Sequence, residues 1–271
     1  MREYQVKSVR ALSRGFEVLA TLERMRAASL HDLHLATGIP KATLIRILRT
    51  AGEHGLVWQR LADGAFLPSQ ISHRGLAEDP TAWLVELASP VMEALVSSVQ
   101  WPSVIAVPRL TFMEVMETNS SKAYFDDIPY GTSRYQANYL RSSVGRAYLA
   151  HCPDDERNAI LQRLRERNAP GDALAFDEVG IAAMVAATRR RGFATRAKDF
   201  GGDSERPREQ VDDGRDSIAL PIRQGDQVLA AINLSWRRNV MTQAQVLDRS
   251  LNEFQAAVGE IEHRAAGAIT G

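Results

Sequence analysis

The stretch from Ser29 to Val57, SLHDLHLATGIPKATLIRILRTAGEHGLV, most constrains what this chain can fold into. Its first part has helical apolar spacing, which Gly38 interrupts, and Pro40 then opens a second amphipathic segment that runs to about Glu53. The pattern predicts two helices joined by a tight turn. A helix, a turn and a helix form either an ordinary helical hairpin or a DNA-binding motif. The residues on the outward face of the second helix distinguish these two possibilities.

The second of these helices carries a small, polar and basic outward face. Its inward stripe has the spacing i, i+3, i+4, i+7 and consists of Leu44, Ile47, Leu48 and Ala51. This register turns five residues outward: Lys41, Ala42, Thr43, Arg46 and Arg49. Small side chains let a helix enter a major groove, hydroxyl and guanidinium groups can bind base edges, and Lys or Arg can bind phosphates. The helix is therefore a candidate DNA-reading helix.

The segment after this helix predicts a β-hairpin. The sequence LVWQRLADGAFLP contains two short strand patterns around an Asp63-Gly64 turn. A helix-turn-helix followed by a hairpin is a winged helix, and Arg60 near the wing is a further DNA-binding candidate. The sequence SVRALSRGFEVLATLERM before the motif predicts a first helix that packs beneath the other two through Val9, Leu12, Phe16, Leu19 and Leu22.

Charge is divided unevenly along a chain whose 271 residues carry no net charge. Residues 1–75 hold 11 Lys and Arg against 6 Asp and Glu, while the remainder holds 22 against 27. A basic head on an acidic body is typical of a nucleic-acid reader with a separate sensing domain. The single cysteine excludes an internal disulfide framework. With no apolar signal core and no run of roughly 20 apolar residues, we expect a cytoplasmic protein without membrane partners.

The rest of the chain predicts a helical linker and an α+β domain. A helical pattern from Asp79-Pro80 onward contains Pro90, and strands follow from Pro102. Three helices are expected from about Ser143 to Arg191, then two strands around Gly225-Asp226 and a closing helix. We expect a DNA-binding domain at 1–75, a linker at 76–100 and an effector-binding domain at 101–271, with an antiparallel sheet flanked by helices.

The second domain shows no pattern typical of catalysis. Gly201-Gly202-Asp203 has no helix behind it with the Lys-Ser or Lys-Thr pair of a phosphate loop, and no His pair has zinc-hydrolase spacing. His151-Cys152 ends a predicted helix and is read as a buried structural cysteine rather than a nucleophile. Adjacent carboxylates such as Asp212-Asp213 diverge on extended backbone. We therefore expect no enzyme, no metal and no cofactor.

Several segments, in order, resemble the IclR family of bacterial transcriptional regulators. They are SVRALSRGFEVLATL, the Ser29–Val57 stretch, LRSSVGRAYLA, RRRGFATRAKDF and SIALPIRQGDQVLAAINLSW. Within the family, the AINLSW ending and the long Gly-rich loop are similar to activators of aromatic-acid catabolism of the 3-(3-hydroxyphenyl)propionate type. The resemblance implies a winged-helix DNA-binding domain, a helical linker and a GAF-like effector domain, assembled as a homodimer or tetramer on a palindromic operator.

The resemblance also implies an effector pocket. The positions that match the family's pocket are Ser143, Val144, Arg208, Ser217, Asn233 and Ser235. Asn233 and Ser235 point to the same side of one strand, and a helix beginning near Ser143 offers free backbone amides to an anion. Arg141 and Arg208 are departures from family members that bind small keto acids, and each is either a carboxylate ligand or a solvated arginine. Val144, Met113 and Phe125 are candidates to face an aromatic ring.

The leading hypothesis is a ligand-responsive transcriptional regulator. Its expected partners are a double-stranded DNA operator, a small organic acid, aromatic in the narrower interpretation, and RNA polymerase in the case of an activator. Two alternatives remain open at this point. One is a constitutive DNA-binding protein without an effector, and the other is an enzyme or small-molecule-binding module whose winged helix contacts proteins instead of DNA.

Overall fold

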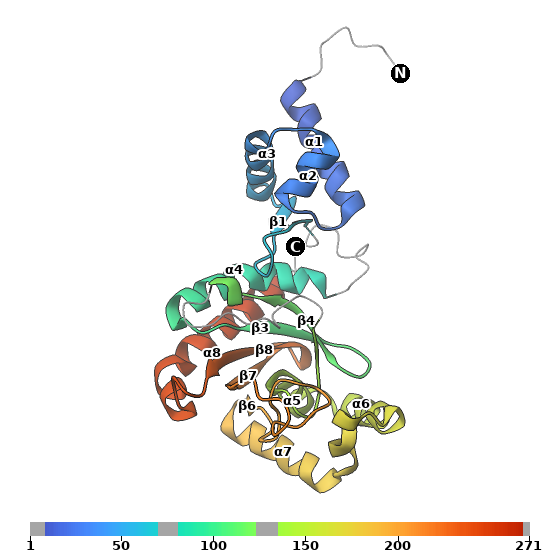
Figure 1. Cartoon of the computed structure of the whole chain (residues 1–271), viewed down its shortest axis with the longest axis vertical. Helices are drawn as coiled ribbons and strands as arrows, with labels where there is room; N and C mark the ends of the chain where they lie inside the picture. The colour runs from blue at the N-terminus through green and yellow to red at the C-terminus, as the bar shows by residue number, and fades with distance from the viewer. Residues whose placement is uncertain (1–8, 70–80, 123–134, 268–271) are drawn as a thin grey trace. The chain divides into compact units, whose positions relative to one another are not determined.

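The structure is a computed structural model that describes residues 9–69, 81–122 and 135–267 (Figure 1). The chain divides into two compact units, Met1–Glu86 and Leu87–Gly271. The domain boundary expected near residues 76–80 lies outside the described residues. Helix α4 (Ala82–Val99) falls within the expected linker and contributes residues to both units.

Unit 1 is a three-helix domain with a small hairpin. Its elements are α1 (Arg10–Met25), α2 (Leu30–Thr37), α3 (Lys41–Glu53), β1 (Val57–Gln59) and β2 (Phe66–Pro68). The two strands pair antiparallel, with Trp58 opposite Leu67, and a further bridge joins Ala28 to Phe66. The predicted helix-turn-helix and wing are therefore confirmed.

Local chemistry fixes both ends of α2. The Ser29 hydroxyl accepts a hydrogen bond from the Asp32 amide at 3.1 Å, and the Asp32 carboxylate accepts one from the Ser29 amide at 3.0 Å. This reciprocal cap satisfies amides that the first helical turn leaves free. Gly38 ends the helix in the left-handed region, with φ of 66°, where a side chain would be strained. The tight turn between α2 and α3 follows from these two ends.

The prediction for the first helix is only partly correct. Leu22 is buried and Leu19 packs against the core, but Val9, Leu12 and Phe16 are 65%, 56% and 61% exposed. The buried residues of α1 are Val18, Thr21 and Leu22, all near its C-terminal end. The first half of α1 therefore has an apolar stripe that unit 1 does not cover.

Unit 2 is built on a six-stranded antiparallel sheet. Its strands are β3 (Val104–Pro108), β4 (Met113–Thr118), β5 (Gln136–Ala137), β6 (Ala194–Thr195), β7 (Arg215–Gln224) and β8 (Gln227–Arg237). Their order is β5-β4-β3-β8-β7-β6. Strands β7 and β8 form a long hairpin in which Ser217 lies opposite Ser235. Gly225 makes the turn with a φ of 57°.

Helices cover both faces of this sheet, so the predicted α+β class is confirmed. They are α5 (Ser143–His151), α6 (Asp154–Arg167), α7 (Glu178–Arg191) and α8 (Gln243–Gly267), with short 3₁₀ turns at Ser120–Lys122 and Pro170–Phe176. In Figure 1, α5 and α7 lie on one side of the sheet, and α8 lies on the other with α4. The long α8 packs along β7.

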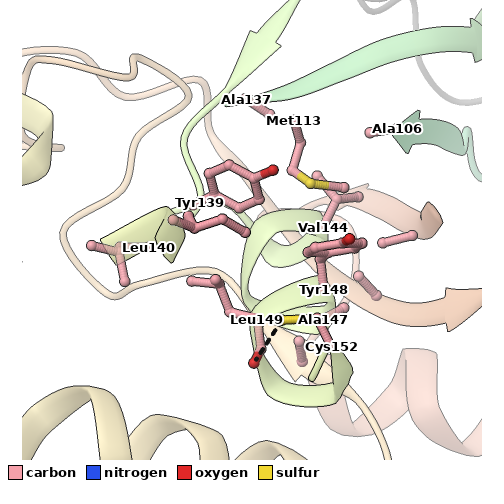
Figure 2. Close-up of a cluster of buried hydrophobic side chains, with 14 of the residues drawn as sticks. Ala106, Met113, Ala137, Tyr139, Leu140, Val144, Ala147, Tyr148, Leu149 and Cys152 are labelled. Atoms are coloured by element: carbon pink, nitrogen blue, oxygen red, sulfur yellow. Dashed lines mark hydrogen bonds between the residues drawn. The ribbon is translucent and has the colours of Figure 1, made fainter. Parts of the chain in front are cut away.

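Helix α5 is the most enclosed helix of unit 2. All of its residues from Ser143 to Ala150 are buried except Arg146. Figure 2 shows Val144, Tyr148 and Met113 in the surrounding apolar cluster. A Cβ on Gly145 would lie 2.4 Å from the Cα of Tyr139, so the helix can approach the preceding turn only with glycine at this position. This close packing holds the N-terminus of α5 in a defined place.

Helix α4 is apolar enough to raise the question of a membrane span. The mean hydropathy over its 18 residues is 1.3. It is the one helix among the described residues that is long and apolar enough to cross a membrane. Ala88 and Met92 are completely buried in unit 2, and the Met92 carbonyl accepts a hydrogen bond from the Asn119 side chain at 2.7 Å. Burial in a protein core accounts for the apolar composition of α4.

Candidate functional site

The outward face of α3 has the exposure that the sequence predicts. Lys41, Ala42, Arg46 and Arg49 are exposed, and Thr43 is half-buried. Leu44, Leu48 and Ala51 are buried, and Ile47 packs against them. Ile45, which the sequence analysis did not single out, is 51% exposed on the same helix. The helix therefore offers solvent a basic face with one aliphatic residue, a composition suited to phosphates and thymine methyl groups.

The three arginines of unit 1 that we singled out differ in availability. Arg46 forms no ion pair in the part of the chain that the structure describes. Arg49 pairs with Glu53 at 3.1 Å, but the side chains are 81% and 60% exposed, so this pair contributes little and is easily opened. Arg60 makes a fork with Asp63, at 3.0 and 2.5 Å, and this hydrogen bonding lowers the pKa of Asp63. Arg60 therefore braces the hairpin turn.

A cavity in unit 2 brings together most of the predicted pocket residues. Ser143, Val144, Ser217, Asn233 and Ser235 all line it. They come from the first turn of α5 and from facing positions of β7 and β8, where Ala219 pairs with Asn233 and Ser217 with Ser235. The cavity has a volume of about 90 Å³. Residues far apart in sequence thus line one partly polar space.

The polar groups of this cavity are mainly hydrogen-bond donors. The Ser142 hydroxyl caps α5 by accepting from the Gly145 amide at 3.1 Å, and the Ser143 and Val144 amides have no acceptor inside the helix. The Ser143 and Ser217 hydroxyls are 2.7 Å apart. The Asn233 oxygen accepts from the Val104 amide at 2.9 Å, which leaves the Asn233 amide nitrogen for a ligand. Such a set of donors favours an anion.

A buried ion pair forms part of the cavity wall. Arg196 makes two hydrogen bonds to the Asp213 carboxylate, at 3.0 and 2.8 Å, and the side chains are 8% and 12% exposed. Arg196 also donates to the Arg215 carbonyl at 2.8 Å and lies 4.7 Å above the Phe200 ring. Asp213 is therefore satisfied by Arg196, and the cavity holds no spare carboxylate that would repel an acid.

The two arginines proposed as carboxylate ligands do not line this cavity. Arg141 is 4% exposed, and its guanidinium donates to four carbonyls of the following loop, those of Asp199, Asp203, Ser204 and Arg206, at 3.1–3.5 Å. Arg208 donates to the Phe200 carbonyl, at 2.6 and 3.1 Å. Both side chains hold the loop because its carbonyls need donors. Arg141 is thus a buried loop brace rather than a solvated or ligand-binding arginine.

The candidates for facing an aromatic ring are also revised. Val144 lines the cavity, but Met113 does not and lies completely buried in the core cluster of Figure 2. Phe125 lies outside the described residues. Phe200 contributes an aromatic wall that sequence reasoning missed. Other lining residues that were missed are Val104, Val115, Tyr135, Ala137, Ser142, Arg196, Gly202, Asp213 and Arg215. The motif RRRGFATRAKDF contains Arg196 and Phe200, but only the pairing of β6 with β7 shows which of its residues reach the cavity.

Cys152 has no feature of a nucleophile. It is 2% exposed at the end of α5, and burial raises the pKa of its thiol to about 12. A protonated, enclosed thiol is unreactive, as the sequence interpretation expected. No cluster of three or more His, Cys, Asp or Glu suited to a metal occurs among the residues that the structure describes.

Comparison with known proteins agrees with both units. Residues 11–61 match the family model described as the IclR helix-turn-helix domain. A protein from Rhodococcus sp. RHA1 is 24% identical, with 96% of this chain and 99% of that chain covered and a TM-score of 0.53. An IclR family transcriptional regulator from Brucella abortus is 22% identical, with 95% of this chain and 93% of that chain covered and a TM-score of 0.52.

A third solved structure contains a ligand. It is an IclR homolog from Microbacterium hydrocarbonoxydans complexed with 4-hydroxybenzoate, 20% identical, with 93% of this chain and 98% of that chain covered and a TM-score of 0.51. At these identities the structures show a shared fold. Residues 11–61 are therefore similar to IclR-type helix-turn-helix domains, and nearly the whole chain shares its fold with these solved structures.

Proposed function

We propose that this chain is an IclR-type transcriptional regulator that binds a palindromic DNA operator through α3, and that a small organic acid in the cavity of unit 2 controls this binding. The observation that carries the proposal is the donor-rich cavity at the N-terminus of α5, lined by Ser143, Ser217 and Asn233. Hydroxyl, amide and helix-terminal N–H groups in an enclosed space bind a carboxylate better than water does.

The size of the cavity restricts its ligand. At about 90 Å³ it is smaller than a protein cavity known to hold benzene, which measures about 150 Å³. A small keto acid therefore fits the cavity as it stands. An aromatic acid such as 4-hydroxybenzoate needs a larger space than this. The complex of the Microbacterium homolog supports including this acid in any screen.

A thermal-shift screen against pyruvate, glyoxylate and 4-hydroxybenzoate tests the effector proposal. A ligand at 100 times its Kd stabilises the folded state by about 2.7 kcal/mol. We expect at least one acid to raise the melting temperature, and Asn233→Ala and Ser235→Ala to reduce this shift while leaving DNA binding unchanged. Calorimetry that finds wild-type affinity in both variants would remove these residues from the site. A screen without any shift would favour a constitutive DNA-binding protein.

Arg46→Ala tests the DNA-reading role of α3. Because Arg46 is exposed and forms no ion pair with the described residues, we expect its loss to weaken binding by about 1–3 kcal/mol if it contacts a base. Arg190→Ala removes the same charge from an exposed position of α7 and serves as the control. Equal affinity of Arg46→Ala and wild type, at one salt concentration, would exclude Arg46 from base reading.

We further propose that the chain acts as a homodimer or a tetramer. The exposed apolar stripe of Val9, Leu12 and Phe16 on α1 supports this assembly, because apolar surface of this kind is usually covered by a partner. Light scattering of Leu12→Glu against Glu17→Lys, an exposed neighbouring position, tests it. A Leu12→Glu variant with the wild-type mass would exclude α1 from the interface. We also propose a cytoplasmic location and, in the case of an activator, contact with RNA polymerase.

A further inference from the structure

Unit 2 has a second hollow that the effector proposal does not use. It lies between α7 and the segment that follows β6, and Arg146 of α5 forms part of its wall. Its volume is about 410 Å³, several times that of the donor-rich cavity. Arg196 lines both spaces, so the second hollow is a neighbour of the first rather than an extension of it.

Positive charge in this hollow exceeds the negative charge available to balance it. Arg146, Arg191 and Lys198 line the hollow, and none of them forms an ion pair with a described carboxylate. The two carboxylates in its wall are fewer than its four cationic side chains. Asp177 caps α7 by accepting from the Gly180 amide at 2.8 Å, and Asp199 lies 3.4 Å from the buried guanidinium of Arg141. The hollow therefore attracts anions.

Arg146 is the cation whose environment most needs an anion. One of its terminal nitrogens donates to the Thr195 carbonyl at 3.1 Å, but its Nε is buried without an acceptor. Burial lowers the pKa of Arg146, the neighbouring positive charge of Arg191 lowers this pKa further, and the negative charge of Asp199 offsets only part of this effect. A buried guanidinium with an unused donor and a like charge beside it is costly, and an anion bridging both arginines would relieve that cost.

The opposite part of the hollow is apolar. Ile181 and Met184, one turn apart on α7, line it and are at most 9% exposed, while Leu174 is 38% exposed at its edge. A short aliphatic chain would cover Leu174 and the small parts of Ile181 and Met184 that remain exposed, whereas a bare inorganic anion would not. The hollow thus combines a cationic end with an apolar wall, an arrangement that fits an amphipathic anion.

We propose that this hollow is a second ligand site, which binds an organic anion with a carboxylate or phosphate head at Arg146 and Arg191 and an aliphatic chain along Ile181 and Met184. The site differs from the effector cavity in charge as well as size, because Arg146, Arg191 and Lys198 form no ion pair with a described carboxylate, whereas Arg196, which both spaces share, is paired with Asp213. Binding at this site does not depend on the effector proposal.

Calorimetry with octanoate, octyl phosphate and the neutral octanol tests the site. Octanoate and octyl phosphate distinguish a carboxylate from a phosphate head, and octanol measures the apolar contribution alone. We expect at least one anion to bind, and Arg191→Gln and Arg146→Gln each to weaken that anion about tenfold, the effect of losing one charged hydrogen bond. Arg191 is exposed at the end of α7, so its variant is expected to fold even if Arg146→Gln does not.

Two controls separate this site from general charge and from the effector cavity. Arg190→Gln removes an exposed charge next to Arg191 but does not line the hollow, so wild-type affinity is expected. Asn233→Ala changes the effector cavity and a contact with Val104 but no residue that lines the second hollow, and wild-type affinity is again expected. The proposal would be overturned if Arg190→Gln and Arg191→Gln lost the same affinity, or if Asn233→Ala lost affinity and Arg191→Gln did not. It would also be overturned if octanol bound as tightly as the anions, or if neither anion bound.

Discussion

The buried pair of Arg196 and Asp213 allows a sharp test of the wall of the effector cavity. Asp213→Asn keeps the shape of the side chain and an oxygen that can accept from Arg196, but it removes the negative charge. Arg196, with a side chain that is 8% exposed, would retain the Arg215 carbonyl at 2.8 Å and the Phe200 ring. It would be left without a charge partner in a place with little access to water.

The expected cost follows from measurements on buried ion pairs in other proteins. Removing one partner of such a pair costs 3–5 kcal/mol, and the retained hydrogen bonds place this variant near the lower limit, at about 3 kcal/mol. For a unit of this size, 1 kcal/mol corresponds to about 2–4 °C. We therefore expect the melting temperature of unit 2 to fall by about 6–12 °C.

Asp212→Asn is the matched control because it changes the adjacent residue in the same way. Asp212 pairs with Arg238, and both side chains are 38% exposed, so the expected loss is below about 1 kcal/mol. Urea unfolding can be followed by the fluorescence of Trp101 and Trp236, which are 2% and 1% exposed in unit 2, after both tryptophans of unit 1 are replaced by Phe. Equal unfolding free energies for the two variants would show that the buried Arg196–Asp213 pair costs no more to break than the exposed Arg238–Asp212 pair.

Three further predictions concern packing, titration and capping. Gly145→Ala would place a Cβ 2.4 Å from the Tyr139 backbone, and we expect thermal unfolding to show a loss of about 3 kcal/mol or more. Burial lowers the pKa of His151. The stabilising contribution of His151 is therefore complete above the unfolded pKa of about 6.5 and is lost as the pH falls through the folded pKa. We expect the urea midpoints at pH 8 and pH 5 to differ more for wild type than for His151→Gln. Ser29→Ala removes the cap shared with Asp32, and its expected cost in denaturant unfolding is about 1 kcal/mol.

Much of the fold is encoded locally and could be predicted from the sequence. The cap at Ser29, the left-handed Gly38 and the strand turn at Gly225 are features of adjacent residues, and they set the ends of their elements correctly. The exposure of Phe16 was mispredicted because a helical period shows which residues share a face, but not how far a neighbouring element extends along that face. The first half of α1 extends beyond its core.

The candidate site was predictable only in part for the same reason. Asn233 and Ser235 share one strand face, so alternation alone places them together. Arginine orientation depends on tertiary partners: Arg141 is held by loop carbonyls that follow it by about sixty residues, and Arg196 reaches the cavity only because β6 pairs with the edge of β7. No local pattern distinguishes these two side chains.

We propose above that an acid in the cavity of unit 2 controls DNA binding by unit 1. The most direct measurement is fluorescence anisotropy of a DNA duplex that the protein selects from a random pool, titrated with and without pyruvate, glyoxylate or 4-hydroxybenzoate. Allosteric coupling of 1–3 kcal/mol corresponds to a shift of about 5–150-fold in DNA affinity. We predict such a shift with at least one acid for the wild-type protein and its loss in Asn233→Ala. If none of the acids changed the DNA affinity, or if the shift remained in Asn233→Ala, an acid in this cavity would not control DNA binding.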